Sequence, residues 1–438
     1  MKNDRLLIVF LATLMILTLT ALASSTVSNS NATLTNAWEN VLPSILNSIK
    51  PPTFPNHDFY VTDFGAIGNG ITDCSQAFEE AIKSCNAAGG GKVIVPAGKF
   101  LTGPIELLSN VDLYLEKGAI ISFSTNTALY SKPEVMGNKY TPLIGAYNQT
   151  NLAITGEGTL NGQANDQNWW PWKKEGKLSD IRPIFIRIRQ CKNVLIQGIT
   201  VINSPAWQIK PENSENIIID GVTIDSLGPN NDGIDVGSDK GVLIENSTFN
   251  TGDDCIALAS GGGAPNPPVV DVVVRNDQFM NGHGALTIGS AVSNGASNVF
   301  FENCTVGSQN AYPWDMLRIK TNLKIGGTIQ NVYVRNIKVI KISKAVFSVN
   351  LGYSLKLSHM LSATNTRIPH VKDIYIENAV SQASKYALLI KGYEESPVQN
   401  IYISNSNFEN VEDENELNYV EGLHMLNVLI NGSSFNII

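Results

Sequence analysis

Three acidic residues, one of which precedes an adjacent pair by about 20 positions, are the first candidates for chemistry in this sequence. Asp232 lies in the segment Asn-Asn-Asp-Gly-Ile-Asp, and the adjacent residues Asp253 and Asp254 begin 21 positions later. If one structural repeat separates them, stacked strands about 4.8 Å apart make these carboxylates neighbours on one face. Like charges so close raise one another's proton affinity, so one carboxyl can stay protonated as an acid while another stays ionised as a base.

Turn structure and calcium binding are two other interpretations of this acidic cluster, because Asp and Asn beside Gly are common in turns and carboxylates bind Ca²⁺. The motifs that follow favour a ligand with negative charge. His283 lies between two glycines, which let a ligand approach the backbone closely. Arg318 and Lys320 are two positions apart, so a strand points both to one side as a clamp for a carboxylate; a solvated strand edge is the alternative.

A recurring unit positions these motifs: a short run in which apolar residues alternate with polar ones. Each unit begins with a small or polar residue, most often Asn, and the later units follow one another at intervals of 23 to 42 residues. The marker residues are Asn110, Asn151, Asn193, Asn216, Gly241, Asp271, Asn298, Asn331, Asp373 and Asn400. Short β-branched runs that cannot bury a face alone and that repeat at this length predict stacked coils.

A right-handed parallel β-helix is the fold that this repeat predicts, because two-residue hairpin signals are scarce and the repeat runs in one direction. A leucine-rich-repeat solenoid is the competing fold, but the leucine spacing does not fit it. Asn at the marker position tolerates left-handed backbone and can form a ladder with the Asn of the next coil. The segment 73–86 is expected to be an amphipathic helix that caps the open end of the core, and Gly89-Gly90-Gly91 ends it.

The N-terminus divides the 438-residue chain into three predicted parts. Residues 1–23 resemble a secretory signal peptide with an Ala-x-Ala cleavage site, with an uncleaved membrane anchor as the alternative. Residues 24–57 are rich in Ser, Thr, Asn and Pro, which predicts a flexible tether or a segment laid on the surface. Residues 58–438 are then one β-helix domain whose length depends on its number of coils.

The composition of the chain argues against several kinds of binding partner and against a disulfide framework. The net charge is -8, and 16% of the residues are charged, so no global attraction for nucleic acid is expected. Five cysteines are too few for a disulfide framework in a chain of this size, and an odd number leaves one thiol unpaired. No Cys/His cluster predicts a metal, and we expect no cofactor.

The four motifs, in this order on a β-helix repeat, resemble the polygalacturonase family, family 28 of the glycoside hydrolases. The resemblance runs from the segment Val-Thr-Asp-Phe-Gly-Ala at position 61 to near the end of the chain. It implies an inverting hydrolase of α-1,4-linked galacturonan, in which two carboxyl groups about 6.5 to 9.5 Å apart protonate the leaving oxygen and activate water. It also implies a mildly acidic pH optimum.

The resemblance assigns a role to each site residue. Asp253 matches the general acid, Asp232 and Asp254 match the carboxylates that activate water, and His283 matches the histidine that supports the acid. The residues matched to substrate binding are Asn230, Arg318, Lys320 and Tyr353. Two positions depart from the family pattern: Asn231 replaces the usual Thr, and Cys255 lacks the usual disulfide partner before the histidine motif, where Phe279 and Met280 stand.

Exo action is the expected mode of cleavage. The segment 140–144, the Trp-Trp-Pro-Trp cluster at 169–172 and the segment 317–322 resemble the exo-acting branch, whose longer loops would wall off one end of a groove. Endo action, cleavage of a substituted galacturonan, a calcium-dependent pectate lyase and a non-catalytic polysaccharide-binding β-helix are the alternatives. The expected protein is a secreted or periplasmic monomer that acts on polygalacturonate or oligogalacturonides, without nucleic-acid or membrane partners after signal cleavage.

Overall fold

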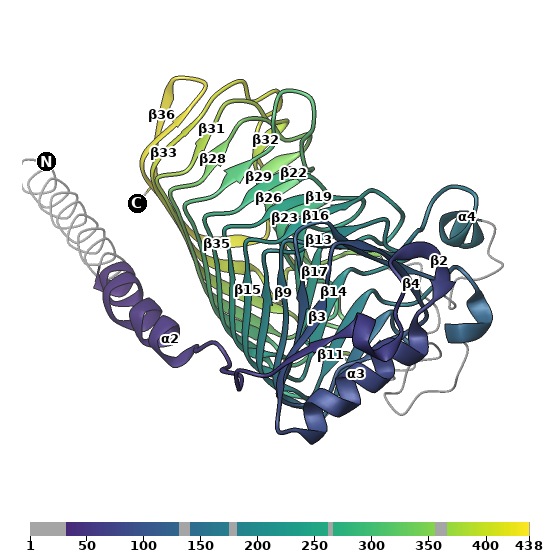
Figure 1. The fold of residues 1–438 in the computed structure, drawn as a ribbon. Helices are drawn as coiled ribbons and strands as arrows, with labels where there is room; N and C mark the ends of the chain where they lie inside the picture. The colour runs from purple at the N-terminus through teal and green to yellow at the C-terminus, as the bar shows by residue number, and fades with distance from the viewer. Residues whose placement is uncertain (1–31, 131–140, 175–181, 262–265, 355–365, 438) are drawn as a thin grey trace, which may run out of the picture.

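The computed structural model describes residues 32–130, 141–174, 182–261, 266–354 and 366–437. These residues form an elongated stack of coils (Figure 1). The strands pair in parallel from coil to coil, which confirms the predicted parallel β-helix. The predicted signal peptide, residues 1–23, lies outside the described residues. Within the described part of the chain, no helix has the length and the apolar character to cross a membrane.

Three columns of strands run along the stack. The ladder column consists of β1 Asp58–Tyr60, β3 Gly91–Val95, β6 Val111–Leu115, β9 Thr150–Gly156, β12 Lys192–Gln197, β15 Glu215–Asp220, β18 Lys240–Glu245, β21 Val269–Arg275, β24 Ala296–Glu302, β27 Thr328–Arg335, β30 His370–Glu377, β33 Val398–Phe408 and β35 Val420–Ile430. The second column consists of β2 Asn69–Asp73, β4 Gly98–Thr102, β7 Ala119–Phe123, β10 Thr159–Asn161, β13 Thr200–Ile202, β16 Thr223–Ser226, β19 Thr248–Thr251, β22 Gln278–Asn281, β25 Thr305–Val306, β28 Lys338–Val339 and β31 Val380–Ser381. The site column consists of β5 Ile105–Glu106, β8 Ile144–Tyr147, β11 Ile186–Arg189, β14 Ile209–Glu212, β17 Ile234–Gly237, β20 Ile256–Ala259, β23 Gly284–Gly289, β26 Asp315–Lys320, β29 Ala345–Asn350, β32 Tyr386–Lys391 and β34 Glu416–Asn418.

The interior of the stack holds one continuous apolar core. Because successive strand residues point to opposite faces, alternate Val, Ile, Leu and Phe side chains enter it from all three columns. Phe249 and Phe279, one coil apart, stack inside it with ring centroids 5.1 Å apart. Each coil therefore buries its apolar face only against its neighbours, as the repeat length predicts.

Left-handed residues mark the start of the ladder column, as expected. All ten marker residues of the repeat have positive φ, between 55° and 70°. Their side chains also pair from coil to coil: Asn193 Nδ2 donates to Asn151 Oδ1 at 2.9 Å, and Asn216 Nδ2 donates to Asn193 Oδ1 at 2.7 Å. The predicted asparagine ladder is confirmed, with a break where Gly241 takes the place of Asn.

Both ends of the stack are covered. The expected capping helix is α3, Ser75–Ala87, and its buried residues Ala77, Phe78, Ala81, Ile82 and Cys85 join the core. At the other end, β36 Ser433–Ile437 pairs antiparallel with β35, so the last coil does not leave a free parallel edge. Other short helices are η2 Val61–Phe64, η3 Thr127–Tyr130 and α4 Trp169–Lys174.

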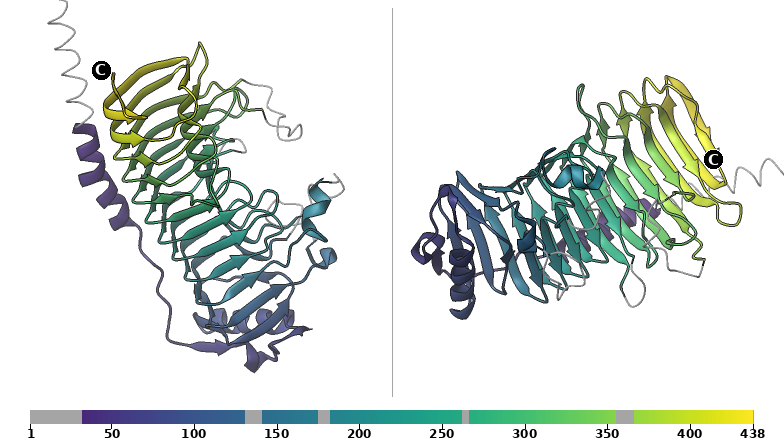
Figure 2. Two further views of the ribbon diagram at one scale, coloured as in Figure 1. Left: turned by 90° about the horizontal axis from the view of Figure 1, so that it is seen from above. Right: turned by 90° about the vertical axis from the view of Figure 1, so that its right-hand side faces the viewer.

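Of the two forms expected for the N-terminal segment, its described part adopts the segment laid on the surface and not the flexible tether, and it does so as a helix that was not predicted from the sequence. Residues 37–48 form η1 Ala37–Val41 and α2 Leu42–Ser48, and Figure 2 shows them along the flank of the stack. Trp38, Leu42, Ile45 and Ile49 pack against the outer face of the ladder column. Their spacing of four, three and four positions is an amphipathic helical stripe, which the Ser- and Asn-rich composition of the segment concealed.

This N-terminal helix docks where the ladder is interrupted. Asn216 Oδ1 accepts a hydrogen bond from the Lys50 amide, and Asn216 Nδ2 donates to the Lys50 carbonyl, both at 2.8 Å. A Cβ at Gly241 would lie 3.6 Å from Ile49 Cγ1, an ordinary van der Waals distance, so Ile49 packs beside the position where the ladder lacks an Asn.

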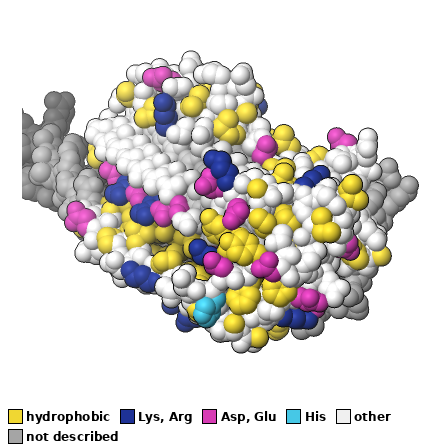
Figure 3. All heavy atoms as spheres, viewed as in Figure 1, with side chains coloured by type: hydrophobic (Ala, Val, Ile, Leu, Met, Phe, Trp, Pro, Cys, Tyr) yellow, Lys and Arg dark blue, Asp and Glu magenta, His cyan; other side chains and the backbone are white. Residues whose placement is uncertain are grey.

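On the face of the molecule shown in Figure 3, acidic and basic side chains are interspersed, and neither kind gathers into one patch.

Candidate active site

The three predicted acids and the histidine come from the turns that enter the site column, which we call the site corner. Asp232 precedes β17, Asp253 and Asp254 precede β20, and His283 precedes β23. Ile234 pairs with Ile256 and Ile256 with Leu286, so these turns belong to successive coils. The expectation that one coil separates Asp232 from the other two acids is confirmed.

Asp254 lies between two cations. Arg318 Nη1 donates to Asp254 Oδ1 at 3.1 Å, and Lys320 Nζ donates to Asp254 Oδ2 at 2.6 Å. Both cationic residues leave β26 on the same side, as their spacing predicts, and both are less than a tenth exposed. In this structure, the carboxylate that the predicted clamp holds is that of Asp254.

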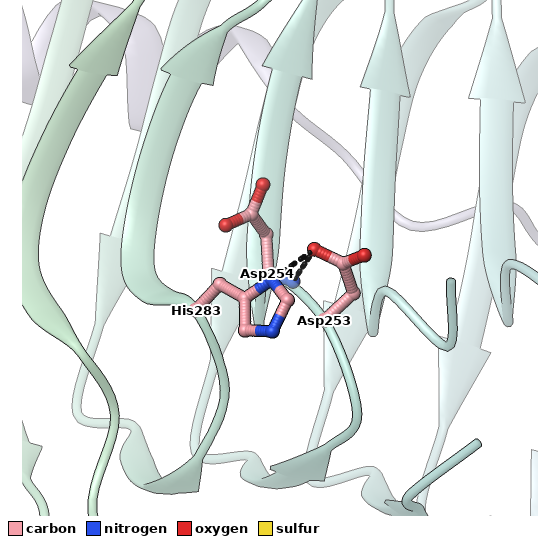
Figure 4. A group of neighbouring side chains, drawn as sticks. All are labelled: Asp253, Asp254 and His283. Atoms are coloured by element: carbon pink, nitrogen blue, oxygen red, sulfur yellow. Dashed lines mark hydrogen bonds and ion pairs between the residues drawn. The ribbon is translucent and has the colours of Figure 1, made fainter. Parts of the chain in front are cut away.

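His283 faces Asp253. Its Nδ1 lies 2.8 Å from Asp253 Oδ1, and Figure 4 shows this pair together while the Asp254 carboxyl points away from it. The imidazole also stacks on Trp314, with ring centroids 3.7 Å apart and an interplanar angle of 19°. Trp314 is 43% exposed, so the stacked rings stand at the solvent-facing side of the corner. Sequence reasoning missed Trp314, because nothing near it in the chain marks its position.

The acids differ in proton affinity. Burial, followed by the charges of Asp253 and Asp254, raises the pKa of Asp232 well above its usual range. Burial also acts to raise the pKa of Asp253, but the hydrogen bond and charge of His283 and the charge of Lys320 outweigh it, so that pKa is lowered. The free protein therefore holds a proton more readily on Asp232 than on Asp253.

The Asn230-Asn231 pair has two separate functions in the turn before Asp232. Asn230 adopts left-handed backbone with φ 54°, and its Nδ2 lies 3.4 Å from Asp253 Oδ2. Asn231 is fully buried: its Oδ1 accepts from Ser226 Oγ at 2.6 Å, and its Nδ2 donates to the Ala206 carbonyl at 3.0 Å. Asn231, the departure from the family pattern, thus braces the turn and leaves Asn230 toward the acids.

Tyr353, which follows β29, lies beside the two cations. Its ring centroid is 5.8 Å from the Arg318 guanidinium carbon and 5.4 Å from Lys320 Nζ, within the range of cation–π attraction. A hydrogen bond of 3.0 Å from its amide to the Thr321 carbonyl ties it to the preceding coil. The structure thus brings the eight predicted site residues together: five lie at the site corner, and Arg318, Lys320 and Tyr353 come from β26 and the turn after β29.

Arg182 is a second residue that sequence reasoning missed. Its Nη2 donates to Asn230 Oδ1 at 2.8 Å, and its Nη1 donates to the carbonyls of Pro205, at 2.9 Å, and Pro229. Burial lowers the pKa of Arg182 to about 10, while the charge of Asp232 acts in the opposite direction, so the guanidinium stays charged at neutral pH. It lies 48 positions before Asn230, and no local motif could have linked the two.

The tryptophan cluster of α4 lies next to this corner. Trp169 is fully buried against Tyr130, with ring centroids 5.8 Å apart. Trp170 Nε1 donates to the Ser204 carbonyl at 2.9 Å, and its indole lies so close to Gly228 that a Cβ there would be 2.2 Å away. Trp169 therefore anchors α4, and Trp170 covers the turn that leads to Asn230.

The described site contains no disulfide, and two cations already contact its acidic cluster. All five cysteines are free and buried, so the bridge usual at Cys255 is absent, as the sequence indicates. The donor atoms of Asp253, Asp254 and His283 lie within 4.8 Å of one another, close enough to surround one ion. Both oxygens of Asp254 already accept from cations, however, and these repel a metal ion at that place.

The fold and the corner define a parallel β-helix with clustered carboxyls of unlike proton affinity beside a buried cationic pair, a site suited to acid–base hydrolysis. The family model described as glycosyl hydrolases family 28 matches residues 85–428, and the chain belongs to this family. It is therefore a glycosidase.

Similar proteins of known name are consistent with this family. The chain is 31% identical to a probable polygalacturonase of Vitis vinifera over 80% of this chain and 74% of that protein. It is 28% identical to an exo-poly-alpha-D-galacturonosidase of Dickeya chrysanthemi over 83% of this chain and 66% of that protein. The crystal structure of a hyperthermoactive exopolygalacturonase from Thermotoga maritima superposes with a TM-score of 0.82, at 34% identity, over 91% of this chain and 97% of that one.

Proposed function

We propose that this protein hydrolyses the α-1,4-galacturonosyl linkages of polygalacturonan from the chain end. The observation that carries the proposal is the set of three carboxyls at the site corner directly beside the buried cations Arg318 and Lys320. Carboxyls of unlike proton affinity supply acid–base catalysis, and buried cations supply affinity for a sugar that bears a carboxylate. The polygalacturonase names of the relatives support the same substrate class.

In the proposed mechanism, Asp253 protonates the leaving oxygen, and Asp232 and Asp254 activate a water on the opposite face of the sugar. Attack from that face inverts the configuration at the anomeric carbon. His283 supports Asp253 through the 2.8 Å contact, and its ring is held in place by Trp314. Asn230 contributes an amide N–H toward the other oxygen of Asp253.

The proton must move to Asp253 before the reaction, because the free protein favours it on Asp232. Substrate binding supplies a reason for that shift. A galacturonate carboxylate at Arg318 and Lys320 offsets the positive charge that helps to keep Asp253 ionised, which raises the proton affinity of Asp253. Loss of the proton leaves Asp232 ionised, as a base must be.

The substrate carboxylate has to share the clamp with Asp254, which occupies it in the free protein. Tyr353 borders the same cations and provides a ring face against which a sugar can pack. In the proposed complex, Arg318 and Lys320 hold a substrate carboxylate while the scissile oxygen lies near Asp253.

Exo action is supported by α4, whose Trp170 covers the turn before Asn230 and so raises a wall beside the site. The similarity to a solved exopolygalacturonase supports the same mode. We further propose that the protein is a secreted or periplasmic monomer, from which residues 1–23 are removed as a signal peptide.

Products from defined oligogalacturonides test the proposal. We expect short products of one size from the first minutes, little fall in the viscosity of polygalacturonate per bond cleaved, and unchanged activity with chelator. Proton NMR of the first product is expected to show the β-anomer, the inverted configuration. A rapid fall in viscosity would show endo action, an α-anomer would exclude inversion, and unsaturated products that disappear with chelator would show a lyase.

A further inference from the structure

The guanidinium of Arg182 joins three successive coils at the site corner. Through Nη1 it binds the carbonyl of Pro205, in the turn between β13 and β14, and that of Pro229, in the turn between β16 and β17. Through Nη2 it binds the side chain of Asn230 in that second turn. Arg182 itself lies just before β11, two coils before Asp232.

These contacts fix which way round the Asn230 amide lies. A guanidinium has only donors, so the atom of Asn230 that faces Arg182 at 2.8 Å must be the carbonyl oxygen. The NH₂ group is then forced to the other side, where Asp253 Oδ2 lies 3.4 Å away. Without the guanidinium, only the 3.4 Å contact with Asp253 orients the amide, and a protonated Asp253 can donate to the amide oxygen instead, so the orientation is lost in the state that the general acid needs.

We propose that Arg182 is a positioning residue for the reaction: it orients the Asn230 amide so that an N–H group, and not the carbonyl oxygen, faces the Asp253 carboxyl. The inference rests on the proposed role of Asp253. Arg182 does not touch the reacting atoms in this arrangement; it acts only through Asn230. Its contacts with the two proline carbonyls are separate and hold the turns in place.

The two functions of Arg182 make different predictions in a double-mutant cycle. R182Q is expected to lower kcat about 10- to 100-fold, because a small displacement at a reacting group has effects of this size. KM is expected to change less than kcat. In an N230A background the further effect of R182Q on kcat is expected to be small, whereas its effect on Tm is expected to be the same in both backgrounds.

Two more variants complete the experiment. R182K keeps the charge and can still donate to Asn230, so we expect a kcat between those of R182Q and the unmodified protein, which also serves if R182Q does not fold. R275Q is the matched control: Arg275 pairs with Glu245 in the ladder column at 2.7 Å, and its loss is expected to leave kcat unchanged.

The outcomes separate this inference from the proposed function. An unchanged kcat in both R182Q and R182K, or an equal fall in kcat for R182Q with and without Asn230, would overturn the role of Arg182. D253N is measured alongside as the reference. If D253N itself retained full turnover, the proposed function of the corner would fail, whatever the Arg182 variants showed.

Discussion

The same coils carry two corners that follow opposite rules. At the start of the ladder column, equivalent positions hold the same kind of residue in coil after coil, all left-handed, and their side chains bond to one another. At the site corner, equivalent positions hold Asn-Asp, Asp-Asp and His-Gly, and like charges meet in a buried place. Repetition lets each coil stabilise the next, whereas the site depends on neighbours that differ.

Removing the proposed acid is expected to have the largest effect. D253N should lower kcat by about 10²- to 10⁴-fold, the usual contribution of general acid catalysis, with little change in Tm. D271N is the matched control, because Asp271 is a left-handed ladder residue that accepts from Asn298 Nδ2 at 2.9 Å. The same substitution there should leave kcat unchanged. An equal fall in kcat for D253N and D271N would contradict the proposed difference between the two corners.

Truncation on the outside of the ladder column is expected to act on stability alone. Trp38 packs edge-on against Phe300, with centroids 5.2 Å apart, and under the Arg335 guanidinium at 3.9 Å. W38A should lower the free energy of unfolding by about 3 kcal/mol or more, as for other buried aromatic residues. Thermal unfolding and kcat, measured on the same sample, check this. A large fall in kcat with an unchanged Tm would link the N-terminal helix to the site.

Within the ladder, backbone strain and side-chain bonding can be separated at Asn298. N298A loses the bonds to Asp271 and from Asn331, and it also replaces an asparagine, which tolerates left-handed backbone, with a residue for which that backbone costs about 1 to 2 kcal/mol. N298G loses the same bonds without that strain. Urea unfolding should therefore rank the unmodified protein above N298G and N298G above N298A. If N298G were the less stable, the strain of left-handed backbone would be smaller here than the conformational entropy that glycine adds to the unfolded chain.

The smallest predicted change in stability has the opposite sign and lies at the site corner. The pKa of Asp232 is raised in the folded state, so this carboxyl binds its proton more tightly when the protein is folded. Its contribution to stability is therefore full below the ordinary pKa of Asp and is lost as pH rises from there toward the raised pKa of the folded state. D232N should therefore raise Tm slightly at neutral pH and have no such effect below about pH 4, the ordinary pKa of Asp. Its kcat should fall sharply. A lower Tm at neutral pH would contradict the raised proton affinity.

Local sequence patterns predicted most of the fold. Period-2 apolar runs and left-handed markers such as Asn193 and Asn298 depend only on nearby backbone, and so they predicted the coils, the ladder and the cap α3. The N-terminal helix was missed because its stability comes from Trp38 and Ile45 packing on the distant strands of the ladder column. Its amphipathic spacing was the one signal that could have found it.

Sequence alone determined that the acids and the histidine meet at the site corner, but not that Trp314 and Arg182 join them. A repeat near one coil in length brings Asp232, Asp253 and His283 together because parallel strands stack in register. Only the tertiary structure decided the states of these groups: which carboxyl holds the proton, that Asp254 fills the clamp, and that Arg182 orients Asn230. Burial, hydrogen bonds and charge at a few ångströms set these properties, and they join residues as far apart as Asp254 and Lys320, 66 positions along the chain.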